Sequence, residues 1–461
     1  MLPPFDLWCS ASVAADVLAV PHGPPAALAQ RRCERLAALL GAAAQGSPLY
    51  REWFAGRDPA RLTLEELPVA RKPALMARFD DWVCDPAIRR DELRRFVADP
   101  ARIAEPFLGR YVVWESSGSS GEPAVFVQDA AAMAVYDALE VLRQPLLRPA
   151  ERMFDPFGLA EQLAFVGATG GHFATTVSIE RLRRLNPLLA GRLHGVSFLQ
   201  PTADLVAELN ALSPSVLASY PSAAVLLAEE QRAGRLHIAP HEVWTGGETL
   251  TAAMARYVEE SFGCPVADSY GASEFLALAF ACRQGRLHLN SDWAILEPVD
   301  ADGRPVPPGV TSASVLLTNL ANHVQPLIRY DLGDRVLVHA EPCACGSTLP
   351  AIEVQGRCDD TLRLAAHGAS VPVLPLALAT VLEDEAGLFD FQLVQEGPAE
   401  LLLRVAQDGA EAKGALRRGR AALARFLERQ GAVAVRIRCR SGEAPRVGRS
   451  GKLQRVVGLG C

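Results

Sequence analysis

A loop rich in glycine and serine follows a short β-type run near residue 115. Residues 111–114 are Tyr-Val-Val-Trp, and residues 116–123 read Ser-Ser-Gly-Ser-Ser-Gly-Glu-Pro. Glycine lets backbone N–H groups converge on a phosphate, while serine hydroxyls donate to phosphate oxygens or bind Mg²⁺. The loop therefore indicates nucleotide chemistry. The same composition is also typical of plain surface loops, so other residues must decide.

The elements that would position this loop indicate an α/β fold. Short apolar runs alternate with helical stretches between about residues 112 and 338, which is the rhythm of α/β architecture. Apolar spacing predicts helices within the first hundred residues, for example at 25–43. We expect a large N-terminal multi-sheet α/β domain, residues 1–355, which binds the ligands, and a small mobile α+β C-terminal domain, residues 356–461.

The C-terminal part has its own sequence pattern. A strand at 401–405, a helix at 410–430 and a strand at 433–439 predict a small βαβ-like unit. The chain changes character near residue 356 and ends in a tail rich in glycine and basic residues. No internal repeat is visible.

Composition limits the function classes. The chain has 461 residues, 49% of them hydrophobic, and a formal net charge of -7, so no global field recruits nucleic acid or an anionic membrane. No long uncharged apolar stretch is present, and the first residues lack the basic-then-apolar order of a secretion signal. A cytoplasmic location is expected. Ten irregularly spaced cysteines suit reduced thiols with one metal site.

Five further motifs follow the loop in order. They are Gly246-Gly247-Glu248, Ser269-Tyr270-Gly271-Ala272-Ser273-Glu274, residues 328–334 (Ile-Arg-Tyr-Asp-Leu-Gly-Asp), residues 356–360 (Gly-Arg-Cys-Asp-Asp) and residues 451–456 (Gly-Lys-Leu-Gln-Arg-Val). In this order and spacing the set resembles the AMP-forming adenylate-forming (acyl-CoA synthetase-like) superfamily, in its phenylacetate–CoA ligase-like branch. The resemblance covers about residues 105–457.

The resemblance implies an activity and its cofactors. Members activate a carboxylic acid with ATP and Mg²⁺ to an acyl adenylate, release pyrophosphate and then transfer the acyl group to CoA. We therefore expect an AMP-forming acid–thiol ligase, and Glu274 is the implied Mg²⁺ ligand, because hard cations take oxygen ligands. The implied ATP-binding residues are Ser116, Ser117, Gly118, Ser119, Ser120, Gly121, Gly247, Glu248, Tyr270, Gly271, Ser273, Asp334 and Arg357.

Several of these residues have specific implied roles. Tyr270 would stack on adenine, and Asp334 would accept hydrogen bonds from both ribose hydroxyls with help from Arg357. Lys452 is the implied catalytic lysine, because a mobile ammonium reaches the carboxylate and the α-phosphate where charge develops. Asp359 is the implied hinge about which the small domain rotates between the two half-reactions.

Cysteine and histidine give a separate signal. Cys343 and Cys345 form a tight Cys-x-Cys-Gly turn, and Cys282 and His288 lie on an earlier ribbon-like segment. Three cysteines and one histidine suit a closed tetrahedral site for structural Zn²⁺. The alternative is a turn with ordinary reduced cysteines.

The sequence is less specific about the substrate. By resemblance the acid pocket contains His172, Phe173, Tyr220 and Phe275, which favours an aromatic or apolar acid. Relatives often have lysine where this loop has Glu122. The segment after the hinge, which guides pantetheine in relatives, aligns only with an insertion. The acceptor is therefore CoA, an amine or a carrier-protein thiol, and the oligomeric state is open.

Two other classes of nucleotide-binding protein fit the sequence less well. A kinase or NTPase would need Gly-x-x-x-x-Gly-Lys-Ser/Thr, which is absent from the sequence. A degenerate, non-catalytic nucleotide-binding protein would be expected to lack Lys452, Glu274 or Asp334, and all three residues are present. An adenylating enzyme therefore remains the favoured interpretation.

Overall fold

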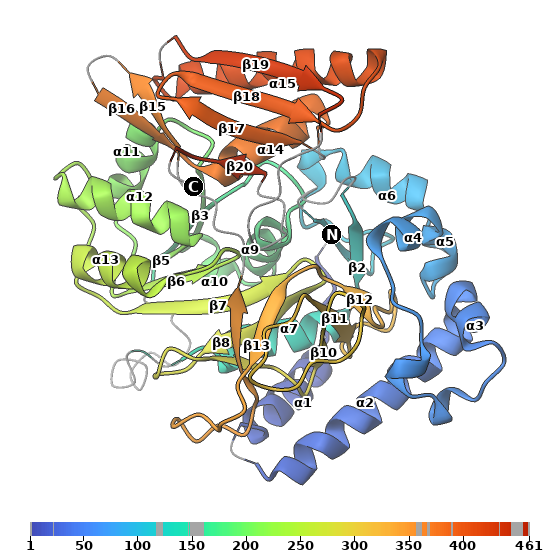
Figure 1. The fold of residues 1–461 in the computed structure, drawn as a ribbon. Coiled ribbons are helices and arrows are strands. Elements are labelled where there is room, and N and C mark those ends of the chain that lie inside the picture. Colours follow the sequence, from blue (N-terminus) through green and yellow to red (C-terminus); the bar gives the residue numbers. More distant parts are fainter. Residues whose placement is uncertain are drawn as a thin grey trace.

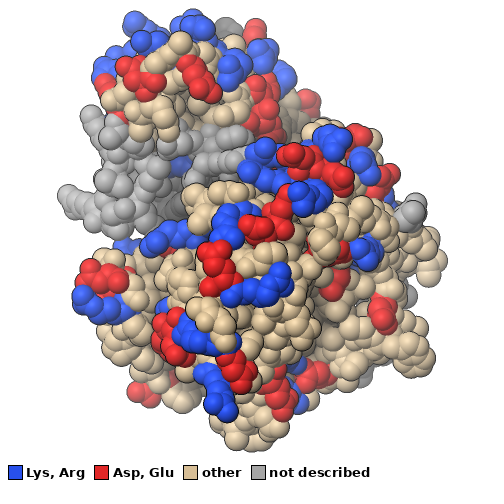
Figure 2. Space-filling view, turned by 90° about the vertical axis from the view of Figure 1, so that its right-hand side faces the viewer, with Lys and Arg blue, Asp and Glu red and all other residues tan. Residues whose placement is uncertain are grey.

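The computed structural model shows a large α/β body with a smaller sheet unit at one side (Figure 1). It describes residues 2–21, 23–116, 123–145, 147, 161–355, 362–366, 369–388, 391–432, 434–443 and 455–459. Acidic and basic side chains are interspersed over the face in Figure 2. None of the described helices combines the length and the apolar character that a membrane crossing requires.

Helices dominate the first hundred residues, as predicted. Proline at the first position of α2 suits a helix start, because its missing N–H would have no helical partner there. Ser47 then caps the next helix by accepting a hydrogen bond from the backbone N–H of Tyr50. The helices are α1 (Leu7–Ala19), α2 (Pro25–Gly46), α3 (Pro48–Phe54), α4 (Lys72–Ala77), α5 (Phe79–Trp82) and α6 (Arg90–Val97), with short 3₁₀ turns at Pro59–Arg61, Leu64–Glu66 and Pro100–Arg102.

A nine-stranded mixed sheet forms the centre of the body, in the order β13-β14-β9-β8-β7-β6-β5-β3-β4. Its parallel strands are β3 (Leu163–Gly167), β4 (Leu193–Ser197), β5 (Val216–Ser219), β6 (Glu242–Gly246) and β7 (Val266–Ala272). Its antiparallel strands are β8 (Phe275–Ala281), β9 (Leu287–Leu289), β13 (Arg335–Val338) and β14 (Ala351–Gln355). The connecting helices are α9 (Ala174–Leu185), α10 (Pro187–Ala190), α11 (Thr202–Leu212), α12 (Pro221–Arg232) and α13 (Ala252–Phe262).

Two smaller sheets complete the body. Strands β1 (Val112–Glu115) and β2 (Val125–Gln128) form an antiparallel hairpin that pairs Glu115 with Val125, so the glycine- and serine-rich sequence is its connection. Helix α7 (Ala130–Leu142) follows it. The three-stranded sheet contains β10 (Ala294–Val299), β11 (Ser314–Asn319) and β12 (Tyr330–Asp331).

The C-terminal domain is a four-stranded sheet with two helices and a hairpin. Strands β18 and β19 are parallel and joined through α15, which confirms the predicted βαβ-like unit. Its elements are β15 (Leu362–Ala366), β16 (Ala369–Val373), α14 (Pro375–Ala386), β17 (Gln392–Gly397), β18 (Glu400–Val405), α15 (Ala410–Arg429), β19 (Arg436–Ser441) and β20 (Val456–Val457). The fold class is confirmed, whereas the boundary at residue 356 falls outside the described residues and stays a prediction.

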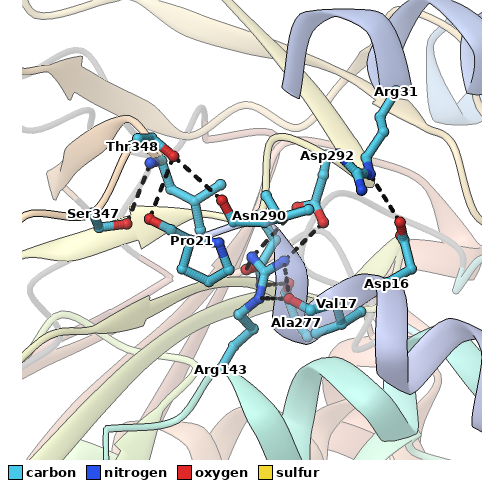
Figure 3. Close-up of polar contacts among 12 residues, drawn as sticks. Asp16, Val17, Pro21, Arg31, Arg143, Ala277, Asn290, Asp292, Ser347 and Thr348 are labelled. Carbon is cyan, nitrogen blue, oxygen red and sulfur yellow. Dashed lines mark hydrogen bonds and ion pairs between the residues drawn. The ribbon is translucent and has the colours of Figure 1, made fainter. Parts of the chain in front are cut away.

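A buried polar network joins the N-terminal helices to the sheet body (Figure 3). Arg143, just after α7, donates to Asp292 Oδ2 at 2.8 Å, to the Asn290 side chain at 3.0 Å and to the Val17 carbonyl at 3.0 Å. The side chains of Arg143 and Asp292 are 4% and 0% exposed. Since a buried charge is stable only when it is paired, this network fixes how the elements dock.

Candidate active site

A cavity of about 970 Å³ lies between the sheet body and the C-terminal domain. Eight described residues of the predicted ATP site line it together: Ser116, Gly247, Glu248, Tyr270, Gly271, Ser273, Glu274 and Asp334. They come from four motifs that are separated by as many as 218 positions in the sequence. The fold therefore brings the predicted residues into one place.

The parallel strands explain why these motifs meet. Gly247 and Glu248 directly follow β6, and Tyr270 and Gly271 lie at the end of β7. Carboxyl ends of parallel strands lie at the same edge, where open α/β sheets bind ligands. Gly247 has φ +79°, and a Cβ there would lie 2.9 Å from the Tyr220 ring, so this turn needs glycine. Glu248 accepts from the backbone N–H of Ser222 at 3.0 Å.

Tyr270 and Asp334 contact each other directly inside the cavity. The Tyr270 hydroxyl donates to Asp334 Oδ2 at 2.8 Å, although 64 positions separate the two residues. Burial and the neighbouring Asp334 charge raise the pKa of Tyr270 well above its ordinary value, so the hydroxyl stays protonated. The hydrogen bond orients the Asp334 carboxylate within the cavity.

Glu274 is a half-buried carboxylate near a cationic and a hydroxyl group. Burial raises its pKa, while a hydrogen bond from the Tyr330 hydroxyl and the charge of Lys72 oppose the rise. The Glu274 backbone carbonyl accepts from the Asn319 side chain at 2.9 Å. An oxygen donor held in this way fits a hard cation such as Mg²⁺.

The cavity also contains functional candidates that sequence reasoning missed. Asp268 and Tyr330 line it, as do the cations Arg71, Lys72 and Arg455. Burial raises the pKa of Asp268 to about 6, although a hydrogen bond at 2.9 Å from the Thr245 hydroxyl acts to lower this pKa. Tyr330, Arg455 and Asp268 each lie inside or next to a recognised motif, and this position could have indicated them as site residues. Arg71 and Lys72 lie in the helical N-terminal part, where no motif indicated them.

Ser116 links the loop region to the cavity. Its hydroxyl accepts from the backbone N–H of Ala124 at 3.0 Å across the β1–β2 hairpin. The remaining predicted loop residues lie outside the described residues: Ser117, Gly118, Ser119, Ser120 and Gly121. The same holds for the predicted cations Arg357 and Lys452 and for the predicted hinge residue Asp359. Their roles stay predictions.

The predicted acid-pocket residues lie apart from this cavity, and none of them lines it. His172 is buried against Phe96, with ring centroids 5.5 Å apart, and burial lowers its pKa so that the ring stays neutral. Phe275 is in the core and packs edge-on against Tyr136 at 5.1 Å. Tyr220 packs edge-on between Phe165 and Phe198, next to Gly247. Phe173, which precedes α9, is partly buried and packs against the core that contains Ala164 and Val166 of β3.

The predicted cysteine and histidine set forms a compact cluster. The ligand atoms of Cys282, His288, Cys343 and Cys345 all lie within 4.8 Å of one another. The Cys282 and Cys343 sulfurs are 3.8 Å apart, and Cys345 Sγ is 3.3 Å from His288 Nε2. A tetrahedron with Zn–S bonds of about 2.3 Å has edges of about 3.8 Å. The His288 Nδ1 contact with the Leu349 carbonyl at 2.8 Å leaves Nε2 for a metal.

The cluster lies beside the cavity. His288 follows the cavity-lining Leu287 on β9, and β9 pairs with β14, which contributes Ile352. Thr348, just after the Cys-x-Cys-Gly turn, donates through its backbone N–H to the Pro21 carbonyl at 3.0 Å (Figure 3). The cluster therefore connects the wall of the cavity with the N-terminal helices.

Sequence comparisons give two curated relatives. Phenylacetate-coenzyme A ligase of Pseudomonas putida is 26% identical over 355 residues, which cover 73% of this chain and 72% of that protein. Protein CapK of Staphylococcus aureus is 25% identical over 138 residues, which are 30% of this chain and only 29% of that protein. No family model matches the chain.

Comparison with solved structures shows a likeness over almost the whole chain. The structure of 2-hydroxyisobutyryl-CoA ligase with 2-HIB-AMP and CoA in the thioesterification state has a TM-score of 0.60 at 22% identity, covering 95% of this chain and 91% of that one. The same ligase in the postadenylation state has a TM-score of 0.54 at 23% identity, covering 93% and 88%. The fold is that of the AMP-forming adenylate-forming superfamily. Within it, the chain is similar to the phenylacetate–CoA ligase-like branch.

Proposed function

We propose that this protein is an AMP-forming acid–CoA ligase with an aromatic or apolar carboxylic acid as substrate. The supporting observation is that eight motif residues, from Ser116 to Asp334, line one cavity of about 970 Å³. That volume suits a nucleotide with a small acyl group, since ligand pockets span about 300–1,000 Å³. The relatives' names support CoA as the acceptor.

The proposed reaction has two steps. A carboxylate oxygen of the acid attacks the α-phosphorus of ATP, the bond to the β-phosphate oxygen breaks, and pyrophosphate leaves. The CoA thiolate then attacks the acyl carbon, AMP leaves, and a thioester forms. The protein's task is to hold the reactants in line and to offset converging negative charge.

Residue roles follow from positions in the cavity. Tyr270 and Asp334 bind adenosine, with Asp334 toward the ribose hydroxyls, and Glu274 holds Mg²⁺, which shields the phosphates when bound. Lys452 stabilises the adenylation transition state, and Asp359 is the hinge between domains 1–355 and 356–461. The proposal of an aromatic or apolar acid rests on the family resemblance, because the aromatic cluster around Tyr220 does not line the cavity.

Pyrophosphate exchange across a panel of aromatic and aliphatic acids tests the first step. The expected result is acid-dependent exchange of labelled pyrophosphate into ATP, with some acids preferred. No exchange with any acid would favour the non-catalytic alternative. Product masses with CoA, with amines and with a carrier protein then identify the acceptor, and an amide product would replace the CoA assignment.

We also propose that Cys282, His288, Cys343 and Cys345 hold a structural Zn²⁺. The sulfur spacing of 3.8 Å and the oriented imidazole support this assignment. Four protein ligands leave no open position, so the metal would not take part in catalysis. Metal analysis should give one zinc per chain in the wild type and clearly less in Cys343→Ser, while Cys33→Ser, at an exposed cysteine, should keep it. Absence of zinc from freshly purified wild type would refute the assignment.

A further inference from the structure

Lysine is rare in this chain. Lys72, Lys413 and Lys452 are its only lysines, although Lys and Arg together number 46. Arginine therefore serves at almost every position where any cation suffices. An ammonium differs from a guanidinium because it is a compact point charge, which fits a single phosphate oxygen in a crowded site.

The three lysines occupy different environments. Lys413 lies on α15 with its side chain 62% exposed, 3.7 Å from Asp408. Lys452 lies in the late Gly-Lys-x-x-Arg-Val motif. Lys72 is half-buried at the start of α4 and lines the cavity, where it interacts electrostatically with Glu274, Glu383 and Arg455. Lys72 thus faces the Mg²⁺-binding carboxylate on one side and the C-terminal domain on the other.

The backbone fixes the segment that carries Lys72. The Ala70 N–H donates to the Arg329 carbonyl at 3.0 Å, and the Asp331 N–H donates to the Ala70 carbonyl at 2.9 Å. Residue 70 thereby forms a parallel bridge with Tyr330, inside the motif that ends at Asp334. Lys72 lies two positions beyond this bridge, so its backbone position is set relative to the ribose- and metal-binding carboxylates.

The side chain of Arg329 strengthens this attachment. Its Nη1 donates to the Leu67 carbonyl at 2.6 Å, and its Nε pairs with Glu297 at 3.1 Å. The backbone at Arg329 has φ +52°, a left-handed conformation that non-glycine residues adopt at some cost. Arg329 therefore adopts an unfavourable backbone conformation at the position where it holds the segment before Lys72.

We infer that Lys72 is a second catalytic lysine, which contacts the α-phosphate oxygens in both half-reactions. The inference rests on the proposed adenylation function. In the resembled superfamily the motif lysine is withdrawn when the small domain rotates. The segment before Lys72 is hydrogen-bonded to β12 of the sheet body, so the backbone position of Lys72 does not depend on that rotation. It would offset phosphate charge when pyrophosphate leaves and again when AMP leaves.

The lysine set provides matched variants. Lys72→Ala should lower acid-dependent pyrophosphate exchange by about 10²-fold, mainly in kcat, and should lower thioester formation from supplied acyl adenylate and CoA by a similar factor. Lys452→Ala should lower the exchange but largely spare the second reaction. Lys413→Ala should leave both rates unchanged. Lys72→Gln, which keeps most of the side-chain volume, and thermal unfolding separate charge loss from misfolding.

A second measurement uses the unmodified protein. Acylation of its three lysines by a water-soluble succinimidyl ester, read by mass spectrometry, should slow at Lys72 when Mg²⁺ and ATP are added. The rate at Lys413 should stay unchanged. Full exchange and thioester rates in folded Lys72→Ala, or unaltered labelling of Lys72 with ATP, would overturn the inference. Wild-type protein without exchange would instead overturn the proposed function.

Discussion

Two regions of the molecule bury charged side chains and balance them in different ways. In the N-terminal network, the Asp292 carboxylate is 0% exposed and is paired with Arg143 at 2.8 Å. In the cavity, burial raises the pKa of both Asp268 and Glu274, because the hydrogen bonds that they accept and the charge of Lys72 near Glu274 do not fully offset the desolvation. Charges balanced within the chain hold elements together, whereas raised carboxylate pKa values in a cavity are typical of functional sites.

The largest expected effect lies in the network. Asp292→Ala leaves the Arg143 guanidinium buried without its carboxylate, so unfolding free energy should fall by about 3–5 kcal/mol. Urea unfolding measures the loss, while exchange activity per folded molecule should stay close to wild type. Glu260→Gln is the matched control, because Glu260 is 69% exposed and pairs with Arg232 at the surface, so its loss should cost less than about 1 kcal/mol. Equal losses in the two variants would remove the contrast between buried and exposed pairs.

Substitution of Glu274 in the cavity should have the opposite effect to that of Asp292, because it should lower activity and not stability. Glu274→Gln keeps the shape but removes the charge that would hold Mg²⁺, so pyrophosphate exchange should fall by about 10²–10³-fold. Thermal stability should stay level or rise, because the desolvation of the carboxylate is only partly offset by Tyr330 and Lys72 and is removed with the charge. Exchange above half of the wild-type rate would show that Glu274 is structural, as Asp292 is. Titration with Mg²⁺ should restore little activity to the variant.

The sequence predicted the part of the site that lies in contiguous motifs. Gly247, Tyr270, Glu274 and Asp334 were identified because they lie in short motifs that resemble those of the superfamily. Lys72 was not, since only the long-range bridge between Ala70 and Tyr330 brings it to the cavity.

The side chains predicted for the acid pocket show another limit of sequence reasoning. Glu274 lies in the turn between β7 and β8 and lines the cavity, whereas Phe275, the first residue of β8, packs in the core against Tyr136. The order of helices and strands along the chain was predictable from the spacing of apolar residues, as the predictions of α15 and β19 show. The direction in which each aromatic side chain points depends on tertiary packing, which the sequence pattern does not show.

A smaller effect is expected at Tyr270. Tyr270→Phe removes the hydroxyl that donates to Asp334 at 2.8 Å, a hydrogen bond to a charged group. The KM for ATP should rise about tenfold with a smaller change in kcat, because such a bond contributes about 1.5 kcal/mol or more. Tyr257→Phe is the control, since that ring lies on α13 against Arg232. An unchanged KM for ATP would mean that Asp334 is oriented without Tyr270.

The smallest effect sharpens the comparison through pH. Burial raises the pKa of Asp268 from its ordinary 3.8 to about 6, so the folded protein holds this proton more tightly than the unfolded chain does. Stability from this group is therefore full below about pH 4, declines as the pH rises toward 6, and is lost above that. Asp268→Asn removes the penalty while keeping an acceptor for Thr245. The variant should be more stable than the wild type at pH 7.5 and show no such gain at pH 4. Urea unfolding of ligand-free protein measures both values, with Asp302→Asn, at a side chain 65% exposed, as the control that should show no such pH trend. A gain of the same size at both pH values would mean that packing, rather than the buried charge, distinguishes the cavity from the network.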